Sequence, residues 1–341
     1  MGLTKESGIT IGAGTPGKLN LITDVPGVKV GHATVRDGAD VNTGVTAILP
    51  HGGNLFQDKV MAASCVINGF GKTMGLVQVE ELGTIETPII MTNTLSIGTA
   101  ANALIKYMLQ QNEDIGATTG TVNPLVCECN DGKLNDIRGM HVTEEHVFQA
   151  LANCDTLFEE GAVGSGTGMC CLGLKGGIGS ASRLVNLDGR YYTVGALVMS
   201  NFGVSGRLTA DGRHIGREIK QKLEAQQDQG SIIMLIATDI PLSERQLKRV
   251  ARRAGVGLAR TGSYYGNGSG DIAIAFTTAN RVPHYSKTAV IETKMLADSK
   301  IDAVFDMTAE AVEEAIISSL YHAETTTGRA GTVRYGLREL L

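Results

Sequence analysis

The sequence contains no tryptophan, and phenylalanine and tyrosine bring the aromatic content to only 4%. We therefore expect a core built from aliphatic and small side chains. Glycine is abundant instead, with 44 of 341 residues, nearly twice its usual share, which predicts many tight turns and close backbone approaches. Hydrophobic residues make up 43% of the chain and charged residues 19%, a balance typical of a globular protein rather than a disordered one.

Long apolar runs are also missing. No run reaches the roughly 18 residues of a membrane-spanning helix, and the polar, glycine-rich stretch 1–18 has no signal-peptide core, so we expect no membrane contact. The net charge is −5 with both signs scattered, which disfavours a nucleic-acid partner. The densest basic stretch, Lys248-Arg249 with Arg252-Arg253, is typical of the solvated side of a helix.

Motifs of metal, nucleotide and common serine-hydrolase sites are absent. The six cysteines occur partly as C-x-C and C-C, without the C-x2-C spacing of zinc sites, and reduced thiols in a cytoplasmic protein are the simplest interpretation. The seven histidines form no metal-ligand pattern, and neither H-E-x-x-H nor G-x-S-x-G occurs. The glycine-rich stretch 164–179 lacks the Gly-Lys-Ser/Thr ending of a phosphate loop. The sequence therefore predicts neither a metal nor a cofactor.

Periodicity and capping signals predict alternating strands and helices in one interwoven domain, 1–341. The pattern fits layered α+β or α/β sheets with helices packed outside. The predicted helices are 99–111, 143–157, 243–259 and 302–320, and the predicted strands include 45–49, 63–67, 88–92, 121–128, 191–200, 231–238 and 271–278.

One segment suggests a specific chemistry: Asn267-Gly268-Ser269-Gly270-Asp271, directly before an apolar strand. Glycine exposes and loosens the peptide bond ahead of Ser269, so the serine hydroxyl can attack the Gly268 carbonyl in an N-to-O shift. Water would then free an amine with a pKa near 8, able to act as a general base beside its own hydroxyl. The alternative is an ordinary glycine-rich loop with Asn and Asp side chains bonded to the backbone.

Seven stretches of the chain, in order, resemble the family of β-peptidyl aminopeptidases and L-aminopeptidase/D-amidase-esterases (the DmpA/BapA type). The resemblance extends over about residues 19–328. The stretches are I-T-D-V-P-G-V-K-V-G-H at Ile22–His32, N-T-G-V-T-A-I-L-P at Asn42–Pro50, I-N-G-F-G-K at Ile67–Lys72, T-N-T-L-S-I-G-T at Thr92–Thr99, C-N-D-G-K-L-N-D at Cys129–Asp136, A-L-V-M-S-N-F-G at Ala196–Gly203, and G-L-A-R-T-G with N-G-S-G-D within Gly257–Asp271.

The resemblance implies an α+β fold, a four-layer αββα sandwich similar to N-terminal-nucleophile hydrolases. It implies a precursor that cuts itself between Gly268 and Ser269 into fragments 1–268 and 269–341. The mature enzyme would release N-terminal residues from small peptides, amides or esters, often with tolerance for D- or β-amino acids, and without a metal. Processed αβ units would form a homo-oligomer, with a tetramer expected.

The same resemblance implies roles for single residues. Ser269 is the expected nucleophile, and Asn201 is a candidate oxyanion donor or else a turn residue capping a strand end. Glu128 would bind the substrate amine, or instead form a loop salt bridge. Thr308 and Glu310 resemble a hydroxyl-x-carboxylate pair that orients the nucleophile, although they also suit the first turn of a helix. Asp271 could face Ser269 or cap its loop.

Three other functions compete with this prediction. A linear-amide hydrolase, like the nylon-oligomer enzymes, would not need a substrate amine. A relative that has lost processing would only bind small molecules or assemble. Self-cleaving acyltransferases use a threonine nucleophile and are therefore disfavoured by Ser269.

Overall fold

The computed structural model describes residues 3, 7–220, 223 and 230–341. Helices within these ranges are α1 (Leu76–Leu82), α2 (Ile97–Gln111), α3 (Glu144–Ala152), α4 (Ile215–Ile219), α5 (Glu244–Arg260) and α6 (Asp302–Tyr321). The strands are β1 (Lys29–Asp37), β2 (Val41–Leu49), β3 (Asp58–Gly69), β4 (Thr84–Ile85), β5 (Ile89–Asn93), β6 (Leu125–Cys129), β7 (Cys170–Cys171), β8 (Leu174–Lys175), β9 (Gly177–Leu187), β10 (Arg190–Asn201), β11 (Ser231–Thr238), β12 (Gly270–Pro283), β13 (Thr326–Thr327) and β14 (Val333–Arg334).

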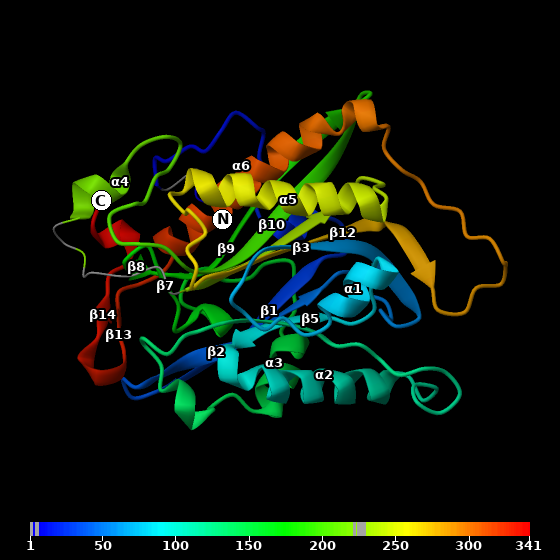
Figure 1. Cartoon of the computed structure of the whole chain (residues 1–341), viewed down its shortest axis with the longest axis horizontal. Coiled ribbons are helices and arrows are strands. Elements are labelled where there is room, and N and C mark those ends of the chain that lie inside the picture. Colours follow the sequence, from blue (N-terminus) through cyan, green and yellow to red (C-terminus); the bar gives the residue numbers. More distant parts are fainter. Residues whose placement is uncertain (1–2, 4–6, 221–222, 224–229) are drawn as a thin grey trace.

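Two sheets and two pairs of helices form four layers (Figure 1). The smaller sheet has the strand order β1-β2-β5-β6, and the larger has the order β4-β3-β12-β11-β10-β9. Helices α2 and α3 cover the outer face of the smaller sheet, while α5 and α6 cover the outer face of the larger one. The four-layer αββα prediction is thereby confirmed.

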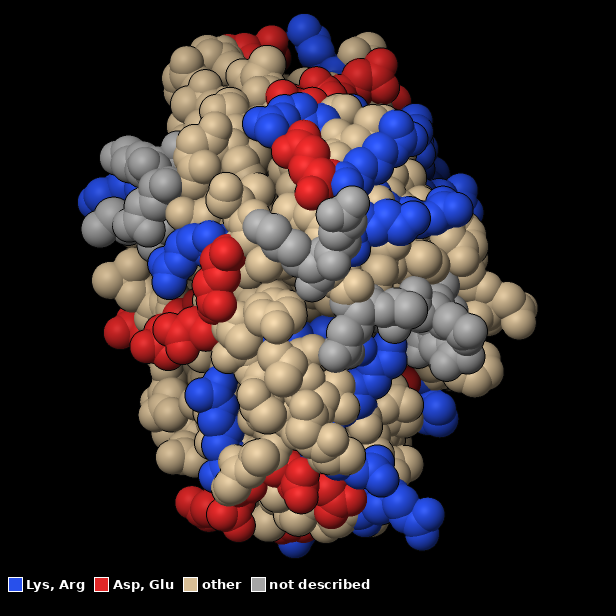
Figure 2. All heavy atoms as spheres, turned by 90° about the vertical axis from the view of Figure 1, so that its left-hand side faces the viewer, with Lys and Arg blue, Asp and Glu red and all other residues tan. Residues whose placement is uncertain are grey.

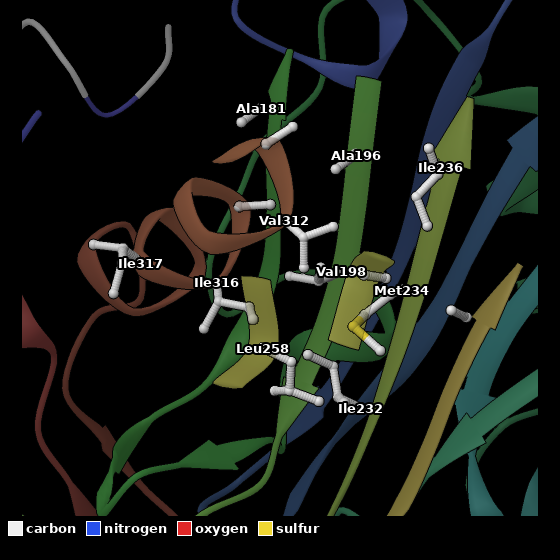
Figure 3. Close-up of a cluster of buried hydrophobic side chains, with 14 of the residues drawn as sticks. Ala181, Ala196, Val198, Ile232, Met234, Ile236, Leu258, Val312, Ile316 and Ile317 are labelled. Carbon is white, nitrogen blue, oxygen red and sulfur yellow. The ribbon is translucent and has the colours of Figure 1, made fainter. Parts of the chain in front are cut away.

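Each interface between layers has its own aliphatic core. Between the larger sheet and its helices lie side chains such as Val198, Met234, Leu258 and Ile316, all fully buried (Figure 3). A second core, with Phe276 among its few aromatic side chains, fills the space between the two sheets. Interleaved Ile, Val, Leu and Ala side chains fill these cores without tryptophan, because small aliphatic side chains can reach the close packing of a protein interior.

The strand that follows Ser269 lies inside the larger sheet. β12 runs parallel to β11 and antiparallel to β3, and its first eight residues are buried. Ile272 and Ile274 face the core between the sheets, whereas Ala273 and Ala275 face the helices. A central strand with two covered faces explains why this segment is almost continuously apolar.

Two predicted elements are shorter in the structure than in the sequence prediction. Helix α3 ends at Ala152 instead of residue 157, because the following backbone turns back to pair with β1: the amide and carbonyl of Val30 bond the carbonyl and amide of Asp155, both at 3.0 Å. Strand β6 begins at Leu125 instead of residue 121, because Pro124 has no N–H to donate to a ladder.

The surface carries both signs of charge. On the face drawn in Figure 2, acidic and basic side chains are interspersed in small groups. Among the described residues, no helix combines the length and the apolar character needed to cross a lipid bilayer.

Candidate active site

Ser269 is buried immediately before the first residue of β12. Its hydroxyl Oγ donates a hydrogen bond of 2.7 Å to Oδ1 of Asp271, and both side chains are at most 1% exposed. Its amide N–H donates to the carbonyl of Gly266 at 2.9 Å, and its own carbonyl accepts from the amide of Phe70 at 3.3 Å. The hydroxyl is therefore held in one place, out of bulk water and against a carboxylate.

The loop ahead of Ser269 is held in uncommon backbone conformations. Gly262 has φ 104° and Tyr265 has φ 57°, a left-handed value that an aromatic residue rarely adopts. The Tyr265 hydroxyl donates to the carbonyl of Gly255, and the Asn68 amide donates to the carbonyl of Gly266 at 2.6 Å. These contacts hold Tyr265, three residues before Gly268, in a backbone conformation that costs on the order of 1–3 kcal/mol.

Glu128 reaches the same place from the smaller sheet. It is 3% exposed near the end of β6, where its carboxylate accepts from the Lys72 amide at 2.8 Å and from the Thr94 hydroxyl. A Cβ on Gly71 would lie 3.5 Å from Glu128 Oε1 and 3.6 Å from the Gly270 Cα. One glycine thus separates this buried carboxylate from β12, the strand that follows Ser269.

Asn201 lies on the other side of β12, on strand β10 of the larger sheet. It is the last residue of β10 and pairs with Ser231 of β11, which pairs in turn with Gly270 of β12. Asn201 and Gly270 are therefore two strands apart, a total of about 10 Å. Its Oδ1 accepts from the Cys170 amide at 2.9 Å, and its Nδ2 donates to the Asn130 carbonyl at 2.9 Å. These bonds fix which end of the side-chain amide is the donor.

A cavity of about 330 Å³ opens beside Asn201. Its lining includes Asn130, Cys170, Asn201 and Gly230, and the Gly230 carbonyl accepts from the amide of Gly270 at 3.2 Å. This cavity therefore adjoins the start of β12 and has the volume of a site for a small ligand.

A buried ammonium group supports one wall of that cavity. Lys175 donates to three backbone carbonyls within residues 166–176, at 2.6 to 2.9 Å, and so fixes the turn that presents the Cys170 amide to Asn201. Burial lowers the pKa of Lys175 to about 7 and raises the pKa of nearby Asp131 to about 6. The turn is thus held by a lysine that the sequence pattern did not single out.

The cysteines next to Glu128 are poor nucleophiles. Burial, reinforced by the charge of Glu128, raises the pKa of the Cys127 thiol to about 12 and that of Cys129 well above its ordinary value. Thiolate is the reactive form of cysteine, so neither residue is activated at neutral pH.

Comparisons with known proteins place this chain in a family. The model of peptidase family S58 matches residues 20–334. The chain belongs to peptidase family S58. It is 39% identical to β-peptidyl aminopeptidase BapA of Sphingosinicella microcystinivorans, over 94% of this chain and 85% of that protein.

Two solved structures of similar proteins cover nearly the whole S58 chain. A protein from Pyrococcus horikoshii OT3 superposes with a TM-score of 0.95 at 60% identity, covering 99% of this chain and 96% of the other. The L-aminopeptidase D-Ala-esterase/amidase of Ochrobactrum anthropi, described as a variant of the N-terminal-nucleophile hydrolase fold, gives 0.90 at 38% identity, covering 97% and 94%. The chain is thus a serine-type hydrolase of peptide or amide bonds, and the predicted family is confirmed.

Thr308 and Glu310 do not join the site of this S58 chain, which corrects their predicted role. The Thr308 hydroxyl donates to the Val304 carbonyl within α6 at 2.6 Å, and Glu310 accepts from Arg183 at 3.0 Å. Residues two apart on a helix point in different directions, so a hydroxyl-x-carboxylate pair within α6 cannot face one serine.

The position of Arg183 shows how far Glu310 lies from Ser269. Arg183 is on the edge strand β9, three strand spacings or about 14 Å across the sheet from β12. It is also six residues along β9 from Gly177, the partner of Ser200 at the site end, which adds about 20 Å along the strand. The backbone and side-chain partners of Glu310 thus belong to a structural network on the far part of the sheet.

That network joins two parts of the chain that are distant in sequence. Arg183, which is 1% exposed, donates to Glu310 and, at 2.6 Å, to Glu314. Glu310 also accepts from the amides of Ala13 and Gly14 at 3.0 and 2.9 Å. Burial by itself would raise the pKa of Glu310. The hydrogen bonds from Ala13, Gly14 and Arg183 and the charge of Arg183 outweigh burial and lower this pKa.

Sequence reasoning missed several residues that shape the site. Lys72 and Thr94 supply the donors that hold Glu128, and Gly71 allows the close approach. All three lie within the stretches that carry the family resemblance, but only the fold brings them together. In the part of the chain that the structure describes, no three His, Cys, Asp or Glu side chains are grouped as metal ligands.

Removing the buried cation tests the structural role of this network. We expect Arg183→Met to lower the free energy of unfolding by about 3–5 kcal/mol, because two carboxylates stay buried without their partner. Arg245→Met is the matched control: it removes an exposed ion pair to Asp298, and its effect should stay below about 1 kcal/mol. Urea unfolding measures both. An Arg183→Met variant with unchanged stability would contradict the structural role of this network.

Proposed function

We propose that the chain cuts itself between Gly268 and Ser269 and that Ser269 then releases N-terminal residues from small peptides, amides or esters. The observation that carries this proposal is the buried Ser269 hydroxyl, held 2.7 Å from a carboxylate at the start of a central strand.

After the cut, one residue would supply both the nucleophile and the base. The freed amine of Ser269 has an ordinary pKa near 8, so part of it is neutral at physiological pH and able to accept the hydroxyl proton. The hydroxyl attacks the substrate carbonyl, and the protonated amine then delivers its proton to the leaving amine. An ester on Ser269 forms and is hydrolysed by water.

Glu128 would make the enzyme an aminopeptidase. Its carboxylate is buried one glycine away from the nucleophile strand, where an ammonium group of the substrate would gain a charge-assisted hydrogen bond. A substrate without a free amine would leave that carboxylate, held by the Lys72 amide and the Thr94 hydroxyl, without a counter-charge. This position favours amine-bearing substrates over the linear amides of the alternative hydrolase.

Asn201 would stabilise the tetrahedral intermediate. Its Oδ1 accepts from the Cys170 amide and one N–H of its Nδ2 donates to the Asn130 carbonyl, so the second N–H would serve an oxyanion in the adjoining cavity. The adjoining cavity of about 330 Å³ suits a small substrate. Because relatives are β-peptidyl aminopeptidases and a D-Ala-esterase/amidase, we propose that D- or β-amino acids are tolerated.

The two fragments would remain one catalytic domain after the cut. In the sheet, β12 of fragment 269–341 lies between β3 and β11 of fragment 1–268, and α6 packs over β9 and β10. We further propose a cytoplasmic location, because all six cysteines are free thiols in the structure.

We also propose that processed units form a homo-oligomer, with a tetramer as the expected state. Strand β4 pairs only with Val60 and Met61, so among the described residues the outer edge of β3 beyond Ala62 has no strand partner. Beside this edge, Val66, Phe70 and Val77 are more than half exposed. A long apolar edge is a known aggregation risk, and pairing with a second copy about a two-fold axis would cover it.

Self-cleavage is visible on a denaturing gel. We expect purified wild-type protein to give fragments of 268 and 73 residues, with Ser269 as the first residue of the smaller one by N-terminal sequencing. Ser269→Ala should stay a single chain and lose turnover, since it removes the attacking oxygen. Uncut wild-type protein with full activity would refute the mechanism.

Recognition of the substrate amine is tested at Glu128. We expect Glu128→Gln to lower kcat/KM for aminoacyl p-nitroanilides about 100-fold, because a buried ammonium loses its counter-charge. Glu113→Gln, at an exposed position, should leave it unchanged. A panel of L-, D- and β-aminoacyl p-nitroanilides defines the preference. Equal rates for Glu128→Gln and wild type would remove this role.

The oligomer is tested by light scattering. The wild-type mass should be a multiple of 35.9 kDa, and Val77→Glu should shift it toward a single unit, because a charge would be buried in the contact. Leu157→Glu, an exposed apolar residue away from β3, serves as the control. A wild-type mass of one chain would contradict the proposal.

A further inference from the structure

A second polar cavity, of about 510 Å³, lies beside the edge strand β9. Strand β1, the segment 158–163 and the residues just after α6 line it. Among the described residues it shares no lining residue with the cavity beside Asn201. Glu160 in its wall accepts from the amide of Ser180 in β9, and β9 is three strand spacings, about 14 Å, from β12. The proposed active site therefore does not account for this cavity.

Glu160 brings a buried carboxylate to the cavity. Its side chain is 4% exposed, and its Oε1 accepts from the Ser318 hydroxyl at 2.6 Å and from the Ser180 amide at 2.7 Å. Its Oε2 lies 3.7 Å from Nδ1 of His322, beyond hydrogen-bonding distance, and has no closer donor in the described part of the chain. Burial raises the pKa of Glu160, as expected for a carboxylate without a full counter-charge.

The end of α6 adds negative charge at the same place. His322 is the C-cap of this 20-residue helix, and the free carbonyls of a last helical turn carry partial negative charge. The exposed carboxylates of Glu159 and Glu324 also line the cavity. Together with Oε2 of Glu160, these groups favour a cation as one part of a ligand.

Arg36 supplies the opposite charge. It is exposed on β1, and one guanidinium nitrogen donates to the Ala162 carbonyl at 2.8 Å, which holds the side chain against the cavity. Within the described ranges no carboxylate lies at ion-pair distance from Arg36, so its other N–H groups are available to a ligand. Phe158 and Val163, both partly buried, give the cavity an apolar wall.

We propose that this cavity binds a free amino acid, with its ammonium group at Glu160, its carboxylate at Arg36 and its side chain along the apolar wall. An ammonium group would complete the hydrogen bonding of Oε2, and a guanidinium binds a carboxylate through paired N–H groups. The volume is within the range of small-ligand sites. This site is separate from Glu128, where the substrate amine is proposed to bind, and does not depend on self-cleavage.

Titration calorimetry with three matched ligands tests the proposal. L-Leucine carries both charges, isoamylamine lacks the carboxylate, and isocaproate lacks the amine. The protein is Glu128→Gln, because this substitution removes the amine recognition proposed for the active site. We expect L-leucine to bind one site per chain, and each of the other two to bind at least about 10-fold more weakly, since each lacks one charge-assisted contact.

Variants distinguish the two ends of the ligand. In the Glu128→Gln protein, Arg36→Gln should weaken L-leucine binding at least about 10-fold and leave isoamylamine binding unchanged, because only the carboxylate loses its partner. Glu160→Gln should weaken both ligands by that factor, while glutamine keeps an oxygen for the two buried donors. Arg217→Gln, at an exposed position of α4, is the matched control and should bind L-leucine as before.

Several outcomes would overturn the proposal. One is L-leucine binding that Arg36→Gln leaves unchanged, and another is equal binding of isoamylamine and L-leucine. A third is L-leucine binding by wild type but not by Glu128→Gln, which would confine the amino acid to the active site. If circular dichroism shows that Glu160→Gln does not fold, the exposed Arg36 decides. Wild type that never cleaves itself would refute the proposed function and leave this inference standing.

Discussion

The position of β12 between β3 and β11 is the constraint on which the site depends. Hydrogen bonds to two neighbours and apolar contacts on both faces fix this strand, so the residue just before it, Ser269, is fixed as well. Its hydroxyl meets Asp271 because the strand holds both. A nucleophile on a mobile loop would lose this alignment, and alignment supplies a large part of the rate in such reactions.

The site draws its side chains from both sheets. Glu128 lies on β6 of the smaller sheet, Asn201 ends β10 of the larger sheet, and Ser269 directly precedes β12. Glycine makes this convergence possible: at Gly230 an added Cβ would stand 1.7 Å from the Asn201 carbonyl oxygen, and Gly71 separates Glu128 from Gly270. Part of the unusual glycine content therefore has a local steric cause at the site.

Charge serves a different purpose on the far part of the sheet. Arg183, Glu310 and Glu314 lie buried between β9 and α6, where the guanidinium joins residues from both sides of the Gly268–Ser269 bond. Separating Arg183 from Glu310 and Glu314 would leave buried charges without a partner, which costs free energy. The network therefore favours fragments 1–268 and 269–341 staying together. In our proposal, stability and chemistry depend on different acidic residues, although the sequence alone does not distinguish the glutamates of the two groups.

The sequence by itself determined the four longest helices, most of the longer strands and the family, because apolar periodicity, capping residues and the long matching stretches are local properties of the chain. It did not predict strand β9 or the short helices α1 and α4. It also marked Ser269, whose glycine neighbours and following strand are adjacent in sequence. Tertiary structure decided which carboxylate meets that serine. Glu310 was expected there but pairs with Arg183, while Asp271, ambiguous in the sequence, faces the hydroxyl. The reason is geometric: side-chain direction follows from helix phase, strand register and sheet order, and these are fixed only when distant segments pack together.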